Sequence, residues 1–346
     1  MYDVVTIGAA TEDVFLTSKL FKIIKDPKHL KKIGIPTGEA ECFTLGAKIE
    51  IDNPVFTTGG GAANTAVAFT RQGLKTALLV KLGRDAAGQR VLKKLKKEKV
   101  SVFPVFDKNL STAYSAILLS LNGRRTILVH HGASGNLKTA EIPFKKIKSR
   151  WAYIAPGNIP FSTLLKIYSR LEKQKTLIAI NPSKHLIEMG IKKLKPVLSK
   201  SKVVILNREE ASYLTKIDYS KEKLIFKKLD AAIDGIAVMT NGAQGAMVSD
   251  GKKIYSAGTS KKRDVVDETG AGDAFSSGFI SGLIRTKEKC DKNKCDPKNI
   301  AYAIRLGSAN AASAIEKIGA TEGLLTRRGF ENNKKWRSLK IMIQIL

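Results

Sequence analysis

The sequence predicts an α/β fold in which a central, mostly parallel β-sheet is flanked by helices and carries a small β-sheet lid. Short β-branched runs alternate with segments whose apolar residues recur at three- and four-residue spacing, which is typical of parallel sheets covered by helices. The predicted core strands are VVTIG (4–8), TALLVKLG (76–83), WAYIAPG (151–157), TLIAINP (176–182), KVVILN (202–207) and GIAVMTNG (235–242). Ligands of open α/β sheets bind beyond the carboxyl ends of the strands, so we expect a site in the loops there.

Two regions, about 14–57 and 101–130, break this alternation and predict the lid. They contain four extra strand-like runs, FTLGAKIEI, PVFTT, TAYSAILLS and RTILVHH. We expect these runs to pair as one small sheet that covers a site at the strand ends, and an edge extension of the main sheet is the alternative. Residues 1–330 are then a single domain with two lid insertions, and residues 331–346 form a C-terminal tail.

The composition limits the partners and the location. The chain has 346 residues, with 60 Lys and Arg against 31 Asp and Glu, for a net charge of +29. This charge suits polyanions, but the lysines are spread along the chain as on solvated helix faces, so we do not expect nucleic acid as the partner. No apolar stretch is long enough to span a bilayer. Residues 1–8 lack the features of a signal peptide, and three cysteines give no disulfide framework, so a cytoplasmic location is expected.

The segment VVDETGAGDAFSSGFISGL (265–283) carries the clearest chemical signal, because a turn of small residues leads directly into a helical pattern. Gly270, Ala271 and Gly272 leave backbone N–H groups uncovered at the predicted helix N-terminus, where the helix dipole also favours a phosphate. Asp273 stands at the same place. Taken alone, this carboxylate is either a favourable helix charge or a catalytic group.

Two motifs resemble the ribokinase (PfkB) family of carbohydrate kinases. The D-x-T-G-A-G-D signature of that family is similar to 267–273, with Asp267 and Thr269 in place. Its other signature, a glycine pair followed by an asparagine and a helix, is similar to TGGGAANTAVAFTRQG (58–73), with Gly59, Gly60 and Asn64 in place. The resemblance implies a ribokinase-like fold over about residues 1–328.

Shorter segments resemble other elements of the family. GAATED places Asp13 where relatives hold sugar hydroxyls, and NREE places Asn207 and Glu210 where relatives lie near the nucleotide phosphates and magnesium. TNGAQGA resembles a loop on the nucleotide side, with Thr240, Gly242 and Gly245, and KIGAT (317–321) resembles a segment beside the adenine and a monovalent-cation site. A P-loop, G-x-x-x-x-G-K-[ST], is absent, so the phosphates need the other anion site.

The resemblance implies ATP-dependent phosphorylation of a sugar hydroxyl. Asp273 would be the catalytic base, and the backbone of 270–273 would hold the transferring phosphoryl group. Glu210 would reach Mg²⁺ through water, and Asp267 with Thr269 would hold K⁺ where one is used.

Two other functions stay open at this stage. A nucleoside kinase of the adenosine type shares the phosphoryl machinery, and the lid would decide between sugar and nucleoside. A scaffold of another class, which binds anions or nucleic acid without catalysis, would use the positive charge instead. Pairing of two lids into a homodimer would cover the exposed edge of the lid sheet.

Overall fold

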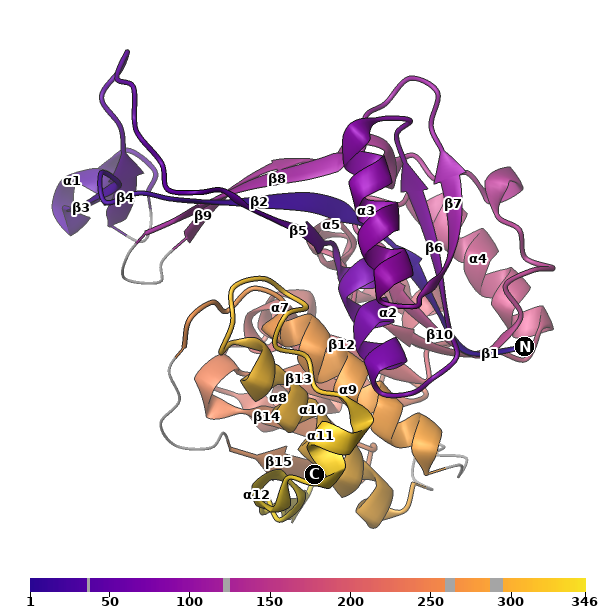
Figure 1. Cartoon of the computed structure of the whole chain (residues 1–346). Helices are drawn as coiled ribbons and strands as arrows, with labels where there is room; N and C mark the ends of the chain where they lie inside the picture. Colours follow the sequence, from indigo (N-terminus) through magenta and orange to yellow (C-terminus); the bar gives the residue numbers. More distant parts are fainter. Residues whose placement is uncertain (36–37, 121–124, 259–264, 287–294) are drawn as a thin grey trace.

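The main body is a ten-stranded sheet, shown in Figure 1 by a computed structural model that describes all residues except 36–37, 121–124, 259–264 and 287–294. The strand order is β16-β15-β14-β13-β12-β11-β10-β1-β6-β7. The seven strands from β13 to β7 in this order pair in parallel. Strands β14, β15 and β16 extend the sheet beyond β13, and each pairs antiparallel with the strand before it. The strands are β1 (Tyr2–Gly8), β6 (Thr76–Leu82), β7 (Ser101–Phe106), β10 (Ser149–Ala155), β11 (Leu177–Ile180), β12 (Val203–Asn207), β13 (Ile236–Thr240), β14 (Ala246–Ser249), β15 (Lys253–Ala257) and β16 (Met342–Ile345).

Helices cover both faces of this sheet, which is why the central strands are apolar throughout rather than alternating. Every residue of β6, for example, is buried. One face packs against α2 (Gly61–Arg71), α3 (Ala86–Lys97), α9 (Ala271–Arg285) and α10 (Pro297–Ala314). The other face packs against α4 (Phe161–Lys173), α5 (Lys184–Glu188), α6 (Gly190–Leu198), α7 (Arg208–Thr215) and α8 (Glu222–Asp230). The six core strands predicted from the sequence are therefore confirmed.

A separate four-stranded sheet forms the lid and extends over the C-terminal half of the body (Figure 1). Its order is β5-β2-β8-β9, with β2 at Thr11–Thr17, β5 at Val55–Gly59, β8 at Ala113–Leu119 and β9 at Arg125–His130. Beyond it, β3 (Lys22–Lys25), α1 (Pro27–Lys32) and β4 (Glu39–Cys42) make a small two-stranded unit. The lid is thus its own sheet and not an edge extension of the main one.

The predicted limits of the lid need two corrections. Residues 101–106 were assigned to the second insertion, but they form β7 and pair in parallel with β6 at the edge of the main sheet. An edge strand is only partly buried and can accommodate a proline such as Pro104. The sequence of β7 therefore resembles that of a lid strand. The first insertion begins earlier than 14, because β2 starts at Thr11, and FTLGAKIEI (43–51) forms no strand.

The C-terminal residues lie on the body. Trp336, in α12 (Lys334–Arg337), is buried against Phe330 of α11 (Arg327–Glu331) and Leu306 of α10. β16 then adds to β15 as an edge strand. In the described part of the chain no helix has both the length and the apolar character needed to cross a membrane. Cys42 is a free thiol, whereas Cys295 is disulfide-bonded, a pairing that the cysteine count did not predict.

Candidate active site

The loops after the central strands meet a glycine turn at one end of the sheet. Gly8 ends β1 beside Ala155 at the end of β10, so close that a Cβ on Gly8 would lie 1.9 Å from the Ala155 carbonyl oxygen. Next to this point, β5 is connected to α2 by Gly59, Gly60 and Gly61. Gly60 has a left-handed φ of 91°. A Cβ on Gly60 would lie 2.6 Å from the Ala9 carbonyl oxygen, so only glycine fits here. This turn separates the two sides of the site.

The anion turn, residues 267–273, opens helix α9. Gly270 is left-handed at φ 78°, and a Cβ there would lie 2.5 Å from the Ala320 Cβ. The N–H of Ala271 donates to the Glu268 carbonyl at 3.3 Å. Within the described ranges no hydrogen bond is recorded for the N–H groups of Gly272 and Asp273, as expected for a first helical turn. These two donors are therefore free to bind an anion at the positive end of the helix.

Asp273 lies in this first turn and is held by a residue of helix α2. The side-chain amide of Asn64, in α2, donates to Asp273 Oδ2 at 2.9 Å. A Cβ on Gly61 would lie 3.2 Å from Asp273 Oδ1, so the third glycine of the turn keeps the carboxylate accessible. Burial raises the pKa of Asp273, and the hydrogen bond from Asn64 opposes this by stabilising the charged form. A half-buried carboxylate with a raised pKa is suited to accept a proton.

Asp13 lies on the opposite side of the same glycine turn. It is 7% exposed, and a Cβ on Gly59 would lie 1.8 Å from its Oδ2. The hydroxyl of Thr11 donates to Asp13 Oδ1 at 2.8 Å. Burial raises the pKa of Asp13, hydrogen bonds from Thr11 and Ser115 lower it, and the nearby charge of Asp267 raises it further. Asp13 and Asp273 thus flank one turn from two sides.

On the predicted nucleotide side, Asn207 and Glu210 form a reciprocal capping box at the N-terminus of helix α7. Asn207 Oδ1 accepts from the Glu210 N–H, and Glu210 Oε2 accepts from the Asn207 N–H, both at 2.8 Å. Burial raises the pKa of Glu210. The cap occupies one carboxylate oxygen of Glu210 and leaves the other for a ligand.

The loop after β13 lies beside this cap. Thr240 pairs with Asn207 at the ends of β13 and β12. Gly242 and Gly245 both have positive φ, and a Cβ on Gly245 would lie 2.0 Å from the Ala257 carbonyl oxygen. The structure therefore brings together the two segments that the sequence assigned to the nucleotide.

Asp267, the first residue of the anion turn, is buried, and both oxygens of its carboxylate accept hydrogen bonds. Oδ1 accepts from the Thr269 N–H at 2.9 Å and from the Thr269 hydroxyl at 2.6 Å. Oδ2 accepts from the Gly319 N–H at 2.9 Å. Arg125 Nη1 lies 3.6 Å from Oδ1. Few oxygen lone pairs remain for a monovalent cation, so the expected K⁺ site fits these residues poorly and stays a prediction.

Sequence reasoning missed two residues that matter to this geometry. Gly61 lies closer to Asp273 than Gly59 or Gly60 does, and the signal was present as the third glycine of TGGG. Arg125 reaches the anion turn from the lid, and its sequence neighbourhood gives no sign of that contact. In the described residues no cluster of three or more His, Cys, Asp or Glu side chains could hold a metal ion by itself.

The family model described as pfkB family carbohydrate kinase matches residues 28–327, and the chain belongs to this family. Both signatures, with Asp273 and the glycine turns, lie within the matched range.

Similar proteins act on different acceptors. An uncharacterized sugar kinase of Archaeoglobus fulgidus is 27% identical over 265 residues, which cover 75% of this chain and 98% of that protein. A cytidine kinase of Thermococcus kodakarensis is 27% identical over 270 residues, covering 75% and 88%. The solved structure of Arabidopsis thaliana ribokinase, complexed with ribose and ATP, superposes with a TM-score of 0.75 at 17% identity and covers 98% of this chain and 99% of that one. The ribokinase-like fold is therefore confirmed, and the chain is a phosphotransferase that acts on a sugar hydroxyl.

Proposed function

We propose that this chain transfers the γ-phosphoryl group of ATP to a primary hydroxyl of a sugar, with Asp273 as the general base. The observation that carries the proposal is the geometry of the anion turn. The free N–H groups of Gly272 and Asp273 open a helix, and a carboxylate of raised pKa stands at the same position. Phosphoryl transfer needs mainly this positioning and charge stabilisation from a protein.

The chemistry follows from these contacts. Asp273 accepts the hydroxyl proton while that oxygen attacks the γ-phosphorus in line, and the bond from phosphorus to the oxygen bridging to ADP breaks. The N–H donors of Gly272 and Asp273 hold the negative charge that gathers on the equatorial oxygens, as an oxyanion hole does. Asn64 keeps the Asp273 carboxylate turned toward the acceptor.

A polyhydroxylated acceptor suits the opposite side of the turn. Asp13 can hold hydroxyls, and its own ligands Thr11 and Ser115 fix its orientation. In the described chain two buried oxygens nearby lack a hydrogen-bond partner, Thr57 Oγ1, opposite Asp13 in β5, and Asn64 Oδ1. Buried polar atoms of this kind are normally paired, so the open acceptor sites of Thr57 and Asn64 support a polar acceptor molecule near this turn.

Magnesium fits the nucleotide side. Glu210 keeps one oxygen outside its helix cap, and a cation that retains several waters needs only one or two such contacts. When bound with the phosphates, Mg²⁺ neutralises part of their charge. We propose that Glu210 holds it through water, with Asn207 alongside.

The test is ATP consumption by the purified chain with ribose, fructose, fructose 6-phosphate, adenosine and cytidine as acceptors. Acceptor-dependent ADP release that Asp273→Asn abolishes supports the assignment. Asp3→Asn is the matched control, because Asp3 lies at the N-terminal end of β1, whereas Gly8 and the site lie at its carboxyl end. Full turnover by Asp273→Asn would remove the base from the proposal.

A nucleoside acceptor is the second candidate, because the chain is 27% identical both to the cytidine kinase and to the uncharacterized sugar kinase. The anion turn serves either acceptor in the same way. Turnover confined to adenosine or cytidine in the same panel would select it.

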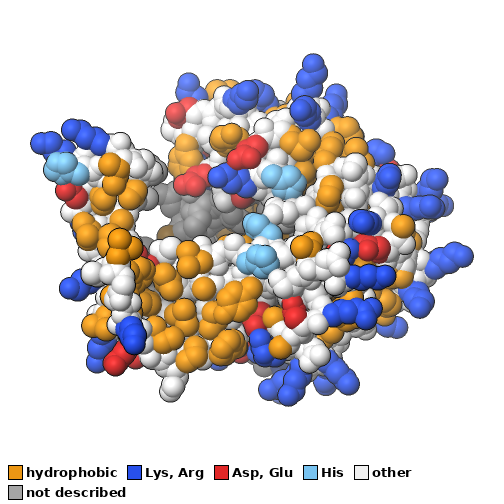
Figure 2. Space-filling model, turned by 90° about the horizontal axis from the view of Figure 1, so that it is seen from above, with side chains coloured by type: hydrophobic (Ala, Val, Ile, Leu, Met, Phe, Trp, Pro, Cys, Tyr) orange, Lys and Arg blue, Asp and Glu red, His pale blue; other side chains and the backbone are white. Residues whose placement is uncertain are grey.

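We also propose that the chain works in the cytoplasm. In addition, we propose that two copies of the chain associate through their lids. Phe56 and Leu128 are 57% and 58% exposed on the lid face opposite Asp13. Figure 2 shows hydrophobic side chains gathered on the side of the view where the lid lies, with Lys and Arg side chains spread along the whole outline. A monomer in sedimentation at micromolar concentration would exclude the dimer.

A further inference from the structure

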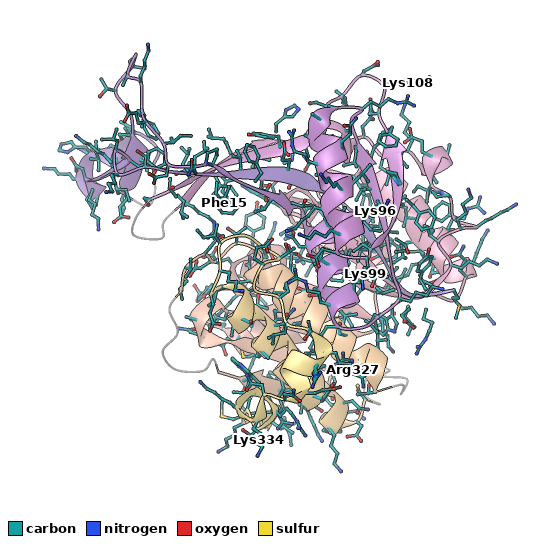
Figure 3. The ribbon with its side chains drawn as sticks, viewed as in Figure 1. Phe15, Lys96, Lys99, Lys108, Arg327 and Lys334 are labelled. Atoms are coloured by element: carbon teal, nitrogen blue, oxygen red, sulfur yellow. The ribbon has the colours of Figure 1, made fainter. Side chains whose placement is uncertain are left out.

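The inner face of the lid contacts residues 315–320, a segment that also contacts the anion turn. Because paired residues share a face, Asp13, Phe15 and Ile117 all face the same side of the lid sheet. Phe15 and Ile117 are 2% and 1% exposed and cluster with Leu119 against Ile318, which follows α10. In Figure 3 Phe15 lies beneath the lid, toward the C-terminal half. This apolar contact fixes the lid over residues 315–320.

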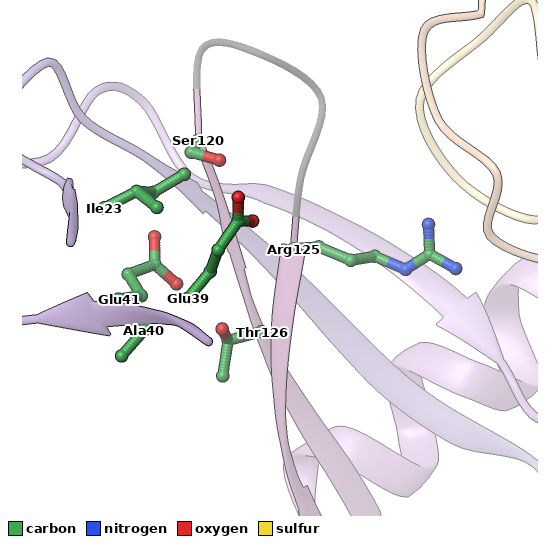
Figure 4. A pocket seen from close by; sticks show the side chains of 7 residues that line it. All are labelled: Ile23, Glu39, Ala40, Glu41, Ser120, Arg125 and Thr126. Carbon is green, nitrogen blue, oxygen red and sulfur yellow. The ribbon is translucent and has the colours of Figure 1, made fainter. Parts of the chain in front are cut away.

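Arg125 extends the same face toward the far end of the lid. It pairs with Leu119 in the sheet, and its Nη1 lies 3.6 Å from Asp267 Oδ1. Figure 4 shows the side chain leaving β9 and pointing away from the other residues around the small pocket there, toward loops of the C-terminal half. The Asp267 side chain is fully buried, whereas that of Arg125 is 26% exposed. The ion pair is therefore a direct link between the lid and the buried end of the anion turn.

The segment that the lid contacts also holds the anion turn in shape. The Val266 N–H donates to the Ile315 carbonyl at 2.9 Å, and the Gly319 N–H donates to Asp267 Oδ2 at 2.9 Å. Gly270 packs against Ala320 with no room for a side chain. Residues 315–320 are thus in contact with the lid on one side and with the catalytic turn on the other.

We propose that Arg125 is a positioning residue that couples the position of the lid to the geometry of the anion turn. This inference rests on the proposed kinase function. Arg125 contacts Asp267 and not the reacting atoms, so it acts through the anion turn. With the lid in place, the charge of Arg125 stabilises the buried Asp267 carboxylate, and that carboxylate accepts the hydrogen bonds that hold residues 269 and 319 in position. The turn is then held in the form that presents the N–H groups of Gly272 and Asp273.

The chain offers a matched control for this contact. Arg150 Nη1 also lies 3.6 Å from an aspartate oxygen, Asp3 Oδ1, at the opposite end of the main sheet. Arg125→Ala and Arg150→Ala therefore each remove an Arg–Asp ion pair at the same distance, although the side chain of Asp3 is 33% exposed and that of Asp267 is fully buried. Only the first should affect transfer.

The kinetic experiment uses the acceptor that the wild-type chain phosphorylates in the panel above. We expect Arg125→Ala to lower kcat about tenfold with the KM for ATP unchanged, because misplacement of the turn weakens only the transition state. The thermal midpoint should fall as well, since the buried Asp267 carboxylate loses its cationic partner, so rates are compared well below both midpoints. ATP hydrolysis without acceptor should rise relative to transfer, since the lid no longer excludes water. Arg125→Lys should restore most of kcat. An unchanged kcat, or a loss equal to that of Arg150→Ala, would overturn the proposal.

A second measurement does not depend on turnover. Amide hydrogen exchange on the free protein reports whether removal of Arg125 loosens the brace. We expect faster exchange at Gly319 and Thr269 in Arg125→Ala, with the interior of α9 unchanged. Equal exchange in both proteins would overturn the coupling even if no acceptor is found. If exchange differs between the two proteins as expected but the wild-type chain phosphorylates no acceptor, the result would count against the proposed function and not against the coupling.

Discussion

The two carboxylates of the site are built in different ways. Asp273 stands in a turn of the rigid body, where backbone N–H groups, Gly270 and the packing of α9 against α10 define the geometry. Asp13 stands on a lid strand, and side chains from that strand and from β8 fix it. A backbone site recognises phosphate in any nucleotide, whereas side chains on a lid recognise a particular acceptor. We therefore expect the backbone half of the site to determine the reaction and the lid half to determine the substrate.

The largest expected effect separates these halves. Asp273→Asn should lower kcat by about a hundredfold or more while ATP still binds, because one element of preorganised catalysis is lost. Initial rates with a saturating acceptor and ATP titrated by calorimetry measure both parts. A kcat within tenfold of wild type would show that transfer needs no base at 273.

The same variant should not lose stability. Because burial raises the pKa of Asp273, the folded chain binds this proton more tightly than the unfolded chain does. The ionised carboxylate therefore costs stability at neutral pH, and this cost declines as the pH falls through the raised pKa and is gone below the pKa of the unfolded chain. Asp273→Asn should keep or raise the thermal midpoint at pH 7, so a lower midpoint would mean that lost activity reflects unfolding.

The acceptor side should respond in KM. Asp13→Ala removes a charged group that holds hydroxyls, and such hydrogen bonds are worth about 1.5–3 kcal/mol, so the KM for the acceptor should rise about ten- to a hundredfold. The KM for ATP should stay the same. Steady-state kinetics with each substrate varied in turn measure this split. An unchanged acceptor KM would remove Asp13 from the site.

Asn64 joins the halves, and its loss should appear in the pH profile. The Asn64 amide lowers the pKa of Asp273, so Asn64→Ala should raise that pKa further. Since the base must be ionised, kcat/KM falls on the acid side as the pH drops through this pKa, and the acid limb should move to higher pH in the variant. Profiles that coincide would mean that another group titrates.

The difference between the halves also explains what the sequence could predict. The core strands and the anion turn could be predicted from local patterns, because an apolar run or a turn of small residues is complete within a few consecutive positions of the sequence. The lid contact of Arg125 with Asp267 joins positions 142 residues apart along the chain, and no local pattern encodes it. The edge strand β7 was misassigned for a related reason, since an edge strand and a lid strand bury similar fractions of their side chains.

The smallest expected effect concerns potassium. Asp267 already accepts hydrogen bonds from Thr269 and Gly319 and lies beside Arg125, so a bound monovalent cation would add little charge stabilisation. Replacing K⁺ by choline should therefore change the wild-type rate by no more than about fivefold, the factor that corresponds to ~1 kcal/mol. In Arg125→Ala the buried carboxylate loses its cation, and K⁺ should then stimulate more strongly than in wild type. Strong dependence on K⁺ in the wild-type chain would show instead that Asp267 and Thr269 hold the ion with Arg125 in place.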